Sequence, residues 1–479
     1  MTVMRQFNGG LIRQIMNSSK ILLALVILLS SLPRVYAAFR RVPYLTPDSF
    51  SYLNLARVLR GENISPFDLH RDDQGFRTPV YPIFLNTIFF LSPKKGTEEA
   101  ILQRIQRHQG FKIDAWHLKF FTQKENLKLV QITQHILGIL STVLLFQLLL
   151  SLTGNSLIAF FGALLVIGWN PTWFWGFELA ILTEILTATL LLTLLWGLCK
   201  LDQTQEIRPR SLWWVSLLGG LLALTRPQFI LATILPLSWW LYKVIRKSAV
   251  FSWHSVVALL LPPLILVGGW ITRNGIRYGF WGISTVTGFN LCIHFTSMKR
   301  IDAFNDKILK QTLYEHIPKC PKCSVKNYRF AIIHIAPNLM LKWKLPYSAI
   351  SKKLEKEAFK AIIHHPDIFM KSIITAIITF FKPLPFPAGF ASFFTIWFPF
   401  GLLLKVGGLA LVLFMPRRFP HFIRILAAFS VATILLTVVV AGGAEPDRHS
   451  FSMEPLLALL TFVVAYSLCL HLWKVEERK

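Results

Sequence analysis

The stretch LVQITQHILGILSTVLLFQLLLSL, residues 129–152, contains no Asp, Glu, Lys or Arg. A hydrocarbon layer of about 30 Å is crossed by a helix of about 20 residues, so this run is long enough to span a bilayer. Backbone polar groups in lipid have to be satisfied within the segment, which predicts a helix rather than an isolated strand. The stretch therefore predicts an integral membrane protein.

Nine further apolar runs bring the expected number of spans to ten. They cover residues 21–39, 155–169, 178–198, 211–225, 228–242, 254–271, 392–415, 421–441 and 451–473. The composition agrees, because 53% of the 479 residues are hydrophobic and 16% are charged, against about 25% charged in soluble domains. A water-soluble enzyme and a disordered chain are both excluded. We expect an all-α polytopic membrane protein with about ten transmembrane helices, and eleven as the alternative.

The run from 211 to 242 allows two interpretations. Thr225-Arg226-Pro227 interrupts it, so it is either two short spans joined by a turn or one long kinked helix. Two spans keep the basic residues near 243–247 and 417–418 on the cytoplasmic side, and we prefer that interpretation. Arg226 is then expected below the outer membrane surface, where an arginine is costly and by default functional; a side chain that reaches to the interface is the simpler alternative.

The net charge of +27 is explained by the membrane rather than by nucleic acid. Lys and Arg concentrate in the short loops that one topology places inside, and short cytoplasmic loops are enriched in these residues. The same topology places the two large loops, residues 40–128 and 272–368, outside the cytoplasm. The sequence thus predicts that the polar loops of interest lie on the extracytoplasmic face; the resemblance described below implies that the membrane is the bacterial cytoplasmic (inner) membrane.

The expected organisation has five parts. They are a cytoplasmic N-terminus (1–20), an N-terminal transmembrane module (21–271) that contains the catalytic loop 40–128, a basic extracytoplasmic region (272–391), C-terminal transmembrane helices (392–473) and a cytoplasmic tail (474–479). Residues 369–383 are expected to form an interfacial helix. A signal peptide is the alternative for the first apolar run.

The second large loop, 272–368, carries 16 Lys and Arg against 6 Asp and Glu. Long loops translocate regardless of charge, so this surplus is compatible with the outside location. Anionic lipid headgroups or a surface glycolipid would suit it as partners, and a merely solubilising basic surface is the equal alternative.

Unusual polar residues gather on the outer side of this topology. Asp48 opens a stretch with helical apolar spacing, where the alternative to a catalytic role is an N-cap. Glu184 lies within the apolar stretch Leu182-Thr183-Glu184-Ile185-Leu186, and a carboxylate there normally faces a cavity, a partner or an ion. Arg273 follows the seventh span, where a simple interfacial anchor is the alternative. Arg448 lies in the last outer loop.

Short motifs in these loops occur in a recognisable order. They are Pro47-Asp48-Ser49 with Tyr52, Arg77 with Pro79-Val80-Tyr81-Pro82, Leu182-Thr183-Glu184, Leu221-Leu222-Ala223-Leu224-Thr225-Arg226-Pro227, Trp270 with Arg273-Asn274 and Gly279, Gly288-Phe289-Asn290-Leu291, His365-Pro366, and Arg448 with Pro455. Over almost the whole chain, this order resembles the bacterial GT-C glycosyltransferases, in particular those akin to protein O-mannosyltransferases and the lipid A aminoarabinose transferase. Two departures concern Asp48, which is followed by Ser49 where many relatives have a second acid, and Arg448, which is followed by His449 where many have tyrosine.

The resemblance implies transfer of a sugar from a polyprenyl-phosphate carrier to a lipid, glycan or protein acceptor. Asp48 would act as general base, with inversion at the anomeric carbon. Arg226, Arg273 and Arg448 would bind the donor phosphate, because guanidinium groups bind phosphate in a bidentate manner and stay charged. The supporting residues expected around this site are Tyr52, Arg77, Tyr81, Glu178, Glu184, Asn274 and His449.

The sequence assigns no definite cofactor, and a divalent cation held by Asp48 and Glu184 is an open alternative. Cys320 and Cys323 form half of a zinc spacing without a second pair, so a local disulfide or two thiols is favoured over zinc. A rival function from another class is a transporter or flippase of a lipid-linked saccharide. That class predicts related halves or polar residues at the midplane, and no internal repeat is evident.

Overall fold

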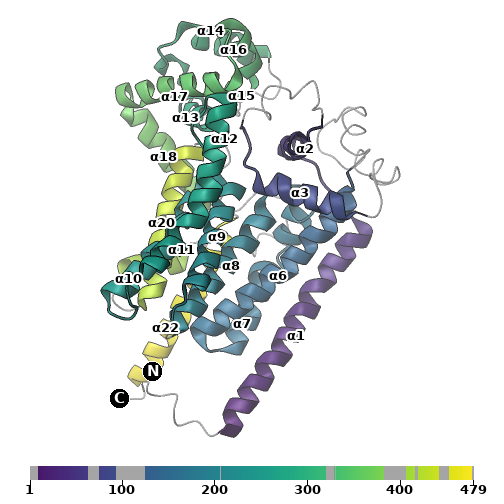
Figure 1. Ribbon diagram of the computed structural model, residues 1–479, viewed down its shortest axis with the longest axis vertical. Helices are drawn as coiled ribbons and strands as arrows, with labels where there is room; N and C mark the ends of the chain where they lie inside the picture. Colours follow the sequence, from purple (N-terminus) through teal and green to yellow (C-terminus); the bar gives the residue numbers. More distant parts are fainter. Residues whose placement is uncertain are drawn as a thin grey trace.

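The chain folds into a helical bundle in a computed structural model (Figure 1). The structure describes residues 9–62, 75–92, 125–204, 206–319, 328, 331–381, 406–415, 419–441 and 452–476. Every regular element in these ranges is helical, and the single β-bridge there pairs Tyr44 with Ala180. The predicted all-α fold is confirmed.

Eight helical segments in the described residues are long and apolar enough to cross a membrane. They are α1 (Gly9–Arg40, apolar from Ser19), α6 (Leu127–Thr153), α7 with η3 and η4 (Ser156–Phe177), α8 (Glu184–Gln203), η5 with α10 (Pro227–Ile245), α11 through η6 to α12 (Trp253–Tyr278), α20 (His421–Ala441) and α22 (Glu454–Glu476). Each coincides with one of the ten predicted runs. Most of the remaining run at 392–415 lies outside the described residues.

The tenth run is α9 (Pro209–Thr225), whose 17 residues make it shorter than the other spans. It ends at Thr225, Arg226 is extended, and η5 (Pro227–Thr233) starts a new helix. A Cβ on Gly219 would lie 2.3 Å from the backbone oxygen of Ala232, so η5 lies directly against α9. The chain therefore reverses at Arg226, and the interpretation as one long helix was wrong.

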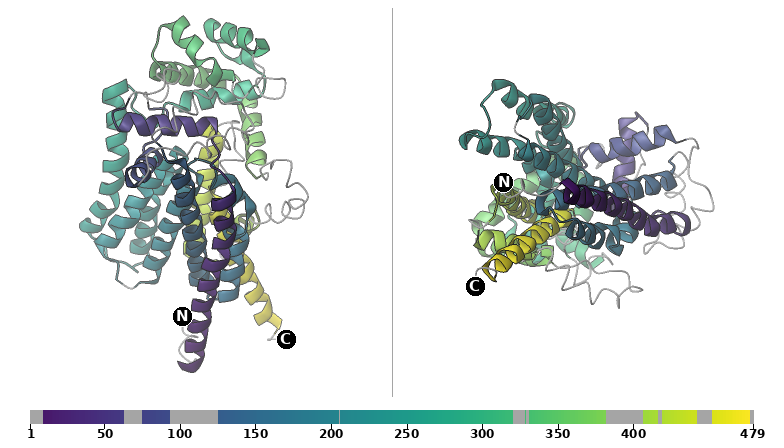
Figure 2. Two further views of the ribbon diagram at one scale, coloured as in Figure 1. Left: turned by 90° about the vertical axis from the view of Figure 1, so that its right-hand side faces the viewer. Right: turned by 90° about the horizontal axis from the view of Figure 1, so that it is seen from below.

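The two ends of the bundle differ. Figures 1 and 2 show the start of α1 and the end of α22 at one end, whereas α2 (Pro47–Leu59), α3 (Val80–Leu91) and the helices of residues 287–364 lie at the other, which we call the loop end. The described parts of the two large loops thus share one end, as the proposed topology requires. Which compartment the loop end faces stays a prediction.

A small helical subdomain occupies the loop end with a core of its own. Its helices are α13 (Thr287–Ser297), α14 (Lys307–His316), α15 (Ala331–His334), α16 (Ala336–Trp343) and α17 (Tyr347–His364). Phe289, Phe295 and Leu354 are among the side chains buried between them. This apolar core is separate from the main core between the spans.

The helix α18 (Pro366–Phe381) connects the subdomain to the bundle. It turns by 105° from α17, and its residues Ala376 and Phe380 belong to the main core. The segment predicted as an interfacial helix, 369–383, therefore descends beside α20 in its described part, to Phe381.

Candidate functional site

Asp48 lies in the first turn of α2, whose start is specified by its neighbours. Thr46 is the N-cap: its hydroxyl accepts from the Ser49 N–H at 3.2 Å, and the Ser49 hydroxyl accepts from the Thr46 N–H at 2.9 Å. This reciprocal pair is a capping box, followed by a proline at the first helical position. The N-cap alternative for Asp48 is therefore wrong, and its carboxylate is available for another role.

Asp48 forms an ion pair with Arg77. The guanidinium carbon of Arg77 lies 4.9 Å from the ring centre of Tyr52 and 4.7 Å from that of Phe76, so the cation is held between two aromatic rings. The side chain of Asp48 is 30% exposed and that of Arg77 18%. Arg77 thus orients the Asp48 carboxylate, which is partly exposed at the loop end.

The segment 75–78 that carries Arg77 is attached to two other parts of the chain. The Thr78 hydroxyl donates to the backbone oxygen of Thr225 at 3.0 Å. On the other side, the N–H of Thr285 donates to the oxygen of Gly75 at 3.0 Å and the Ser284 hydroxyl to that of Phe76 at 2.6 Å. The segment is consequently fixed between the end of α9 and the start of the subdomain.

Arg226 occupies the C-terminal end of α9. The following proline disfavours helical geometry for this residue, which has φ −144° and ψ 118°. Its guanidinium Nη1 lies 3.5 Å from Glu184 Oε1 and donates to the Ser452 hydroxyl at 2.7 Å. Arg226 is 6% exposed and Glu184 0%. Arg226 is therefore buried with Glu184 as a partner, and its position below the outer membrane surface stays a prediction.

The Asp48 and Glu184 segments are joined by backbone hydrogen bonds. Tyr44, just before α2, donates its N–H to the oxygen of Leu179 at 2.8 Å, and its own oxygen accepts from the N–H of Ile181 at 3.1 Å. Together with the Thr78 to Thr225 bond, these contacts connect the Asp48 to Arg77 pair with the Arg226 to Glu184 pair at one end of the bundle. These four predicted site residues therefore lie on segments that contact one another, and their convergence into one site stays a prediction.

Tyr52 and Tyr81 lie between the two ion pairs. Their rings meet edge to face with centres 5.1 Å apart, and the Tyr81 hydroxyl donates to Gln134 Oε1 at 2.7 Å. Burial raises the pKa of Tyr81 well above its ordinary value of 10, and the nearby Tyr52 and the Glu184 carboxylate add to that rise. Tyr81 is therefore a neutral hydrogen-bond donor to Gln134.

Arg273 and Asn274 approach the site from α12 (Gly269–Tyr278). The Arg273 guanidinium carbon lies 4.5 Å from the Trp270 ring centre and 4.9 Å from that of Tyr278, and Arg273 Nη1 donates to Asn274 Oδ1 at 3.0 Å. Asn274 lies against Gly75, where φ is +76° and an added Cβ would be 3.3 Å from Asn274 Oδ1. Asn274 thus contacts the 75–78 segment, whereas the contacts of Arg273 are local.

Glu178 belongs to a different cluster. Arg34 of α1 donates to both of its carboxylate oxygens, at 2.6 Å from Nη2 and 2.9 Å from Nε, and His135 Nδ1 lies 2.8 Å from Oε2. Arg34 is 1% exposed and Glu178 0%. Arg34 also donates to the backbone oxygens of Ser30 and Gly168. This buried group ties α1 to α6, and sequence reasoning found neither Arg34 nor His135.

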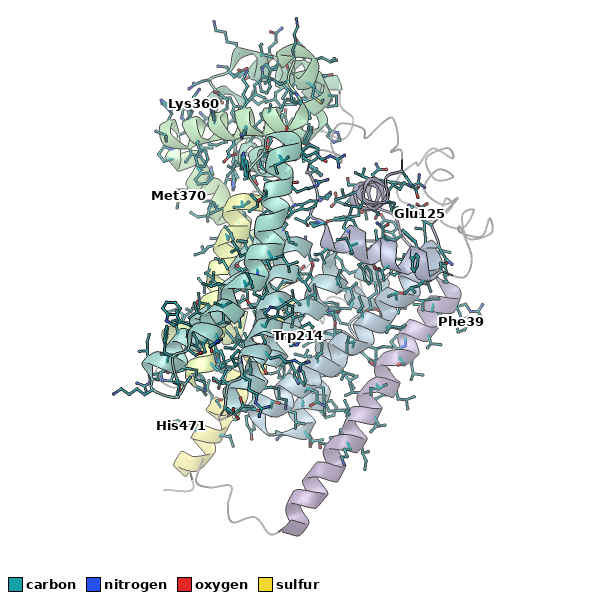
Figure 3. All side chains as sticks on the ribbon, in the orientation of Figure 1. Phe39, Glu125, Trp214, Lys360, Met370 and His471 are labelled. Atoms are coloured by element: carbon teal, nitrogen blue, oxygen red, sulfur yellow. The ribbon has the colours of Figure 1, made fainter. Side chains whose placement is uncertain are left out.

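A second ion-pair group missed by sequence reasoning lies at the end of α2. Glu125 accepts from Arg57 at 2.7 Å and from Arg60 at 2.9 Å, and it is 1% exposed. Figure 3 shows Glu125 at the loop end. This cluster anchors α2 to the chain just before α6, so that the other end of α2, with Asp48, is held in place.

The described residues contain no group of three His, Cys, Asp or Glu that could hold a metal ion. Asp48 and Glu184 each pair with an arginine instead, which is not the set of oxygen ligands that a divalent cation requires. These two residues therefore do not fit the cation site considered from the sequence. Arg448, His449, Cys320 and Cys323 lie outside the described residues.

The fold and site define a polytopic helical membrane protein with an accessible carboxylate and a recessed guanidinium at one end of the bundle. No protein-family model and no curated protein sequence matches the chain.

Two kinds of solved structure are similar to this one. The archaeal oligosaccharyltransferase AglB from Archaeoglobus fulgidus, in complex with an inhibitory peptide and a dolichol-phosphate, is matched over 96% of this chain and 51% of its own, with 10% identity and a TM-score of 0.46. ArnT from Cupriavidus metallidurans bound to undecaprenyl phosphate is matched over 96% of this chain and 78% of its own, with 11% identity and a TM-score of 0.33. The chain spans about half the length of AglB.

Proposed function

We propose that this protein is an integral membrane glycosyltransferase that moves a sugar from a polyprenyl-phosphate carrier to an acceptor on the extracytoplasmic face. The observation that carries the proposal is the joining of two ion pairs at the loop end, Asp48 with Arg77 and Arg226 with Glu184, through the Thr78 to Thr225 hydrogen bond. One pair offers a base and the other a cation, which are the two groups that this reaction needs.

Asp48 is the proposed general base. The acceptor hydroxyl loses its proton to the Asp48 carboxylate while its oxygen attacks the anomeric carbon of the sugar. The bond from that carbon to the phosphate oxygen breaks, and the electron pair leaves with the polyprenyl phosphate, so configuration is inverted. A phosphate is already a good leaving group, so one carboxylate is sufficient, in contrast to glycoside hydrolysis.

The arginines supply the charge that the leaving group requires. Negative charge grows on the phosphate beside lipid, where preorganised cations have their largest effect. Arg226 is buried at the end of α9, and a donor phosphate would compete with Glu184 and Ser452 for its guanidinium group. Arg77 lies beside the base and would contact the same phosphate.

Arg273 and Arg448 are proposed as outer contacts of the donor. Support for Arg273 comes from its neighbour Asn274, which contacts Gly75 in the segment that carries Arg77. Asp48 is more exposed than Arg226. This difference fits an acceptor that arrives from the aqueous side and a lipid-linked donor that arrives from the bilayer.

The test uses the purified full chain in liposomes with a polyprenyl-phosphate-linked radioactive sugar and an extract of envelope lipids and glycans as acceptors. Wild type is expected to transfer label. Asp48→Asn is expected to transfer it at least about 100-fold more slowly while still binding the carrier. Asp202→Asn, at the opposite end of α8, serves as the control. Equal transfer by wild type and Asp48→Asn would refute the proposed base. Movement of intact labelled carrier across the bilayer without transfer would favour the transporter class instead.

A further inference from the structure

The bend between α17 and α18 exposes an unusual set of apolar side chains. Phe359 and Ile363 on α17 are 51% and 75% exposed, and Met370, Ile374 and Ile378 on α18 are 52%, 54% and 55% exposed. Each group follows the four-residue spacing of one helix face. The first group ends and the second begins within one or two turns of the bend, and exposed apolar patches of this kind mark an interaction surface.

A histidine contact places this bend relative to the membrane spans. His294 of α13 contacts the Ser372 hydroxyl of α18 at 2.9 Å and the backbone oxygen of Val439 in α20 at 3.0 Å. Val439 is the penultimate residue of the candidate span His421–Val440. Ser372 therefore lies at the level where an apolar span ends, and the residues of α18 beyond it run alongside that span.

The exposed face of α18 therefore runs beside the candidate span α20. The opposite face places Ala376 and Phe380 in the main core, so Ile374 and Ile378 point away from the protein at the level of that candidate span. Ile363 and Met370, on either side of the bend, fall near the membrane boundary. Figure 3 shows Met370 on α18, close to Lys360 on α17.

Exposed lysines surround the same bend. Lys356 and Lys360 share the outer face of α17 with Phe359 and Ile363, and Lys371 follows Met370 on α18. Lys360 also pairs with Glu357 at 2.8 Å, while its side chain is 54% exposed. By contrast, Lys353 is engaged within the subdomain, with Asp306 at 3.0 Å. A helix with apolar side chains and flanking lysines is suited to lie in the headgroup layer.

We infer that the α17 to α18 bend is a lipid-docking surface, in which Phe359, Ile363 and Met370 enter the outer part of the bilayer and Lys356, Lys360 and Lys371 bind anionic phospholipid headgroups. This surface holds the basic subdomain against the membrane. It is separate from the Asp48 and Arg226 site and does not depend on the proposed function. Its recognition chemistry is ammonium to lipid phosphate, beside apolar contact with acyl chains.

The first experiment places a photoreactive benzophenone amino acid at position 363 in the full chain, in nanodiscs of equimolar phosphatidylglycerol and phosphatidylcholine. The matched control is position 341, because Leu341 on α16 is 78% exposed and α16 lies at the far top of the subdomain (Figure 1). Lipid adducts are expected at 363 and not at 341. The inference is overturned by an adduct to protein alone at 363, or by equal lipid yields at both positions.

The second experiment tests the lysines with the same probe. Phosphatidylglycerol adducts at 363 are expected to exceed phosphatidylcholine adducts several-fold, since each basic residue near a membrane surface adds about 5-fold in preference. Lys356→Gln/Lys371→Gln should lower the ratio several-fold, whereas Lys307→Gln/Lys310→Gln on α14 should leave it unchanged. An unchanged ratio in the first double variant, or an equal fall in both, would contradict the assignment.

Discussion

The Thr78 hydroxyl donates a hydrogen bond of 3.0 Å to the backbone oxygen of Thr225, 147 residues further along the chain. Each partner is the chain neighbour of an arginine of the proposed site: Thr78 directly follows Arg77, and Thr225 directly precedes Arg226. One side-chain hydroxyl thus sets the register between the segment that pairs with Asp48 and the segment that pairs with Glu184. The proposed site depends on this register.

Removing this hydroxyl should reduce activity more than stability. We expect Thr78→Val to lose about 10-fold in kcat/KM through misplacement of the two arginines, with a stability cost of about 1 kcal/mol for one hydrogen bond. The measurements are transfer kinetics and thermal unfolding in detergent. Thr87→Val is the matched control, because its hydroxyl bonds to the Ile83 oxygen within α3. Equal kinetic losses in both variants would argue against a positioning role for Thr78.

Because Arg226 pairs with Glu184, we expect the loss of both charges to affect the unfolding temperature and carrier binding differently. Arg226→Ala removes the guanidinium from a carboxylate that is 0% exposed, so it should lower the unfolding temperature as well as carrier binding. Arg226→Met/Glu184→Gln removes both charges and should recover most of the stability but none of the carrier binding. Recovery of binding in the double variant would show that Arg226 does not contact the phosphate.

The buried cluster of Arg34, Glu178 and His135 predicts a structural role. Glu178→Gln leaves the guanidinium of Arg34 without its charged partner at a 1% exposed position, and we expect a loss of about 3–5 kcal/mol. The readout is thermal unfolding. If Glu178 instead takes part in the proposed chemistry, as considered from the sequence, activity will fall at temperatures where the variant remains folded.

A glycine beside this cluster offers an independent test. A Cβ on Gly138 would lie 2.2 Å from Glu178 Oε1 and 2.7 Å from Arg34 Nε, whereas a Cβ on Gly269 would meet nothing within 4 Å. Gly138→Ala should therefore destabilise by about 1–3 kcal/mol or more, and Gly269→Ala should not destabilise. Similar unfolding temperatures for the two variants would contradict the close packing of α1 against α6.

His294 predicts a pH dependence of stability. Burial lowers the pKa of His294 below its ordinary value of 6.5, although the hydrogen bond to the Val439 oxygen opposes this. Below pH 6.5 the unfolded chain therefore binds a proton that the folded chain does not, and stability falls as the pH falls towards the folded pKa. His294→Gln should reduce this fall between pH 7.5 and about 5.5. Identical pH profiles for wild type and His294→Gln would exclude this contribution.

Much of the fold could be predicted because membrane-spanning helices appear in the sequence as long apolar runs. Apolar length alone located eight of the ten expected runs as candidate spans, and the proline after Arg226 marked the reversal between α9 and η5. Charge in the short loops then placed the two large loops together. The sequence did not predict that α18 turns into the main core, because Lys371 interrupts its apolar run.

The site was predictable where motifs are local and less so where contacts are distant. Asp48, Arg77, Glu184 and Arg226 were singled out from the sequence, but their pairing across the fold depends on backbone contacts that no local pattern encodes, such as Tyr44 with Leu179. Glu178 was assigned to the site because it is an acid at the start of a predicted span. Its partner Arg34 lies in the last turns of the first span, where an arginine is ordinarily read as an interfacial anchor.

In the proposed site, one phosphate-binding centre lies between the segments of Arg77 and Arg226, beside Asp48. An experimental structure of the full chain with bound polyprenyl phosphate in a nanodisc is the decisive measurement. We expect phosphate density within hydrogen-bonding distance, about 3 Å, of the Arg226 guanidinium and on the same side as the Asp48 carboxylate. A phosphate bound instead at the terminal end of the bundle, or at the loop end but remote from both arginines, would contradict it.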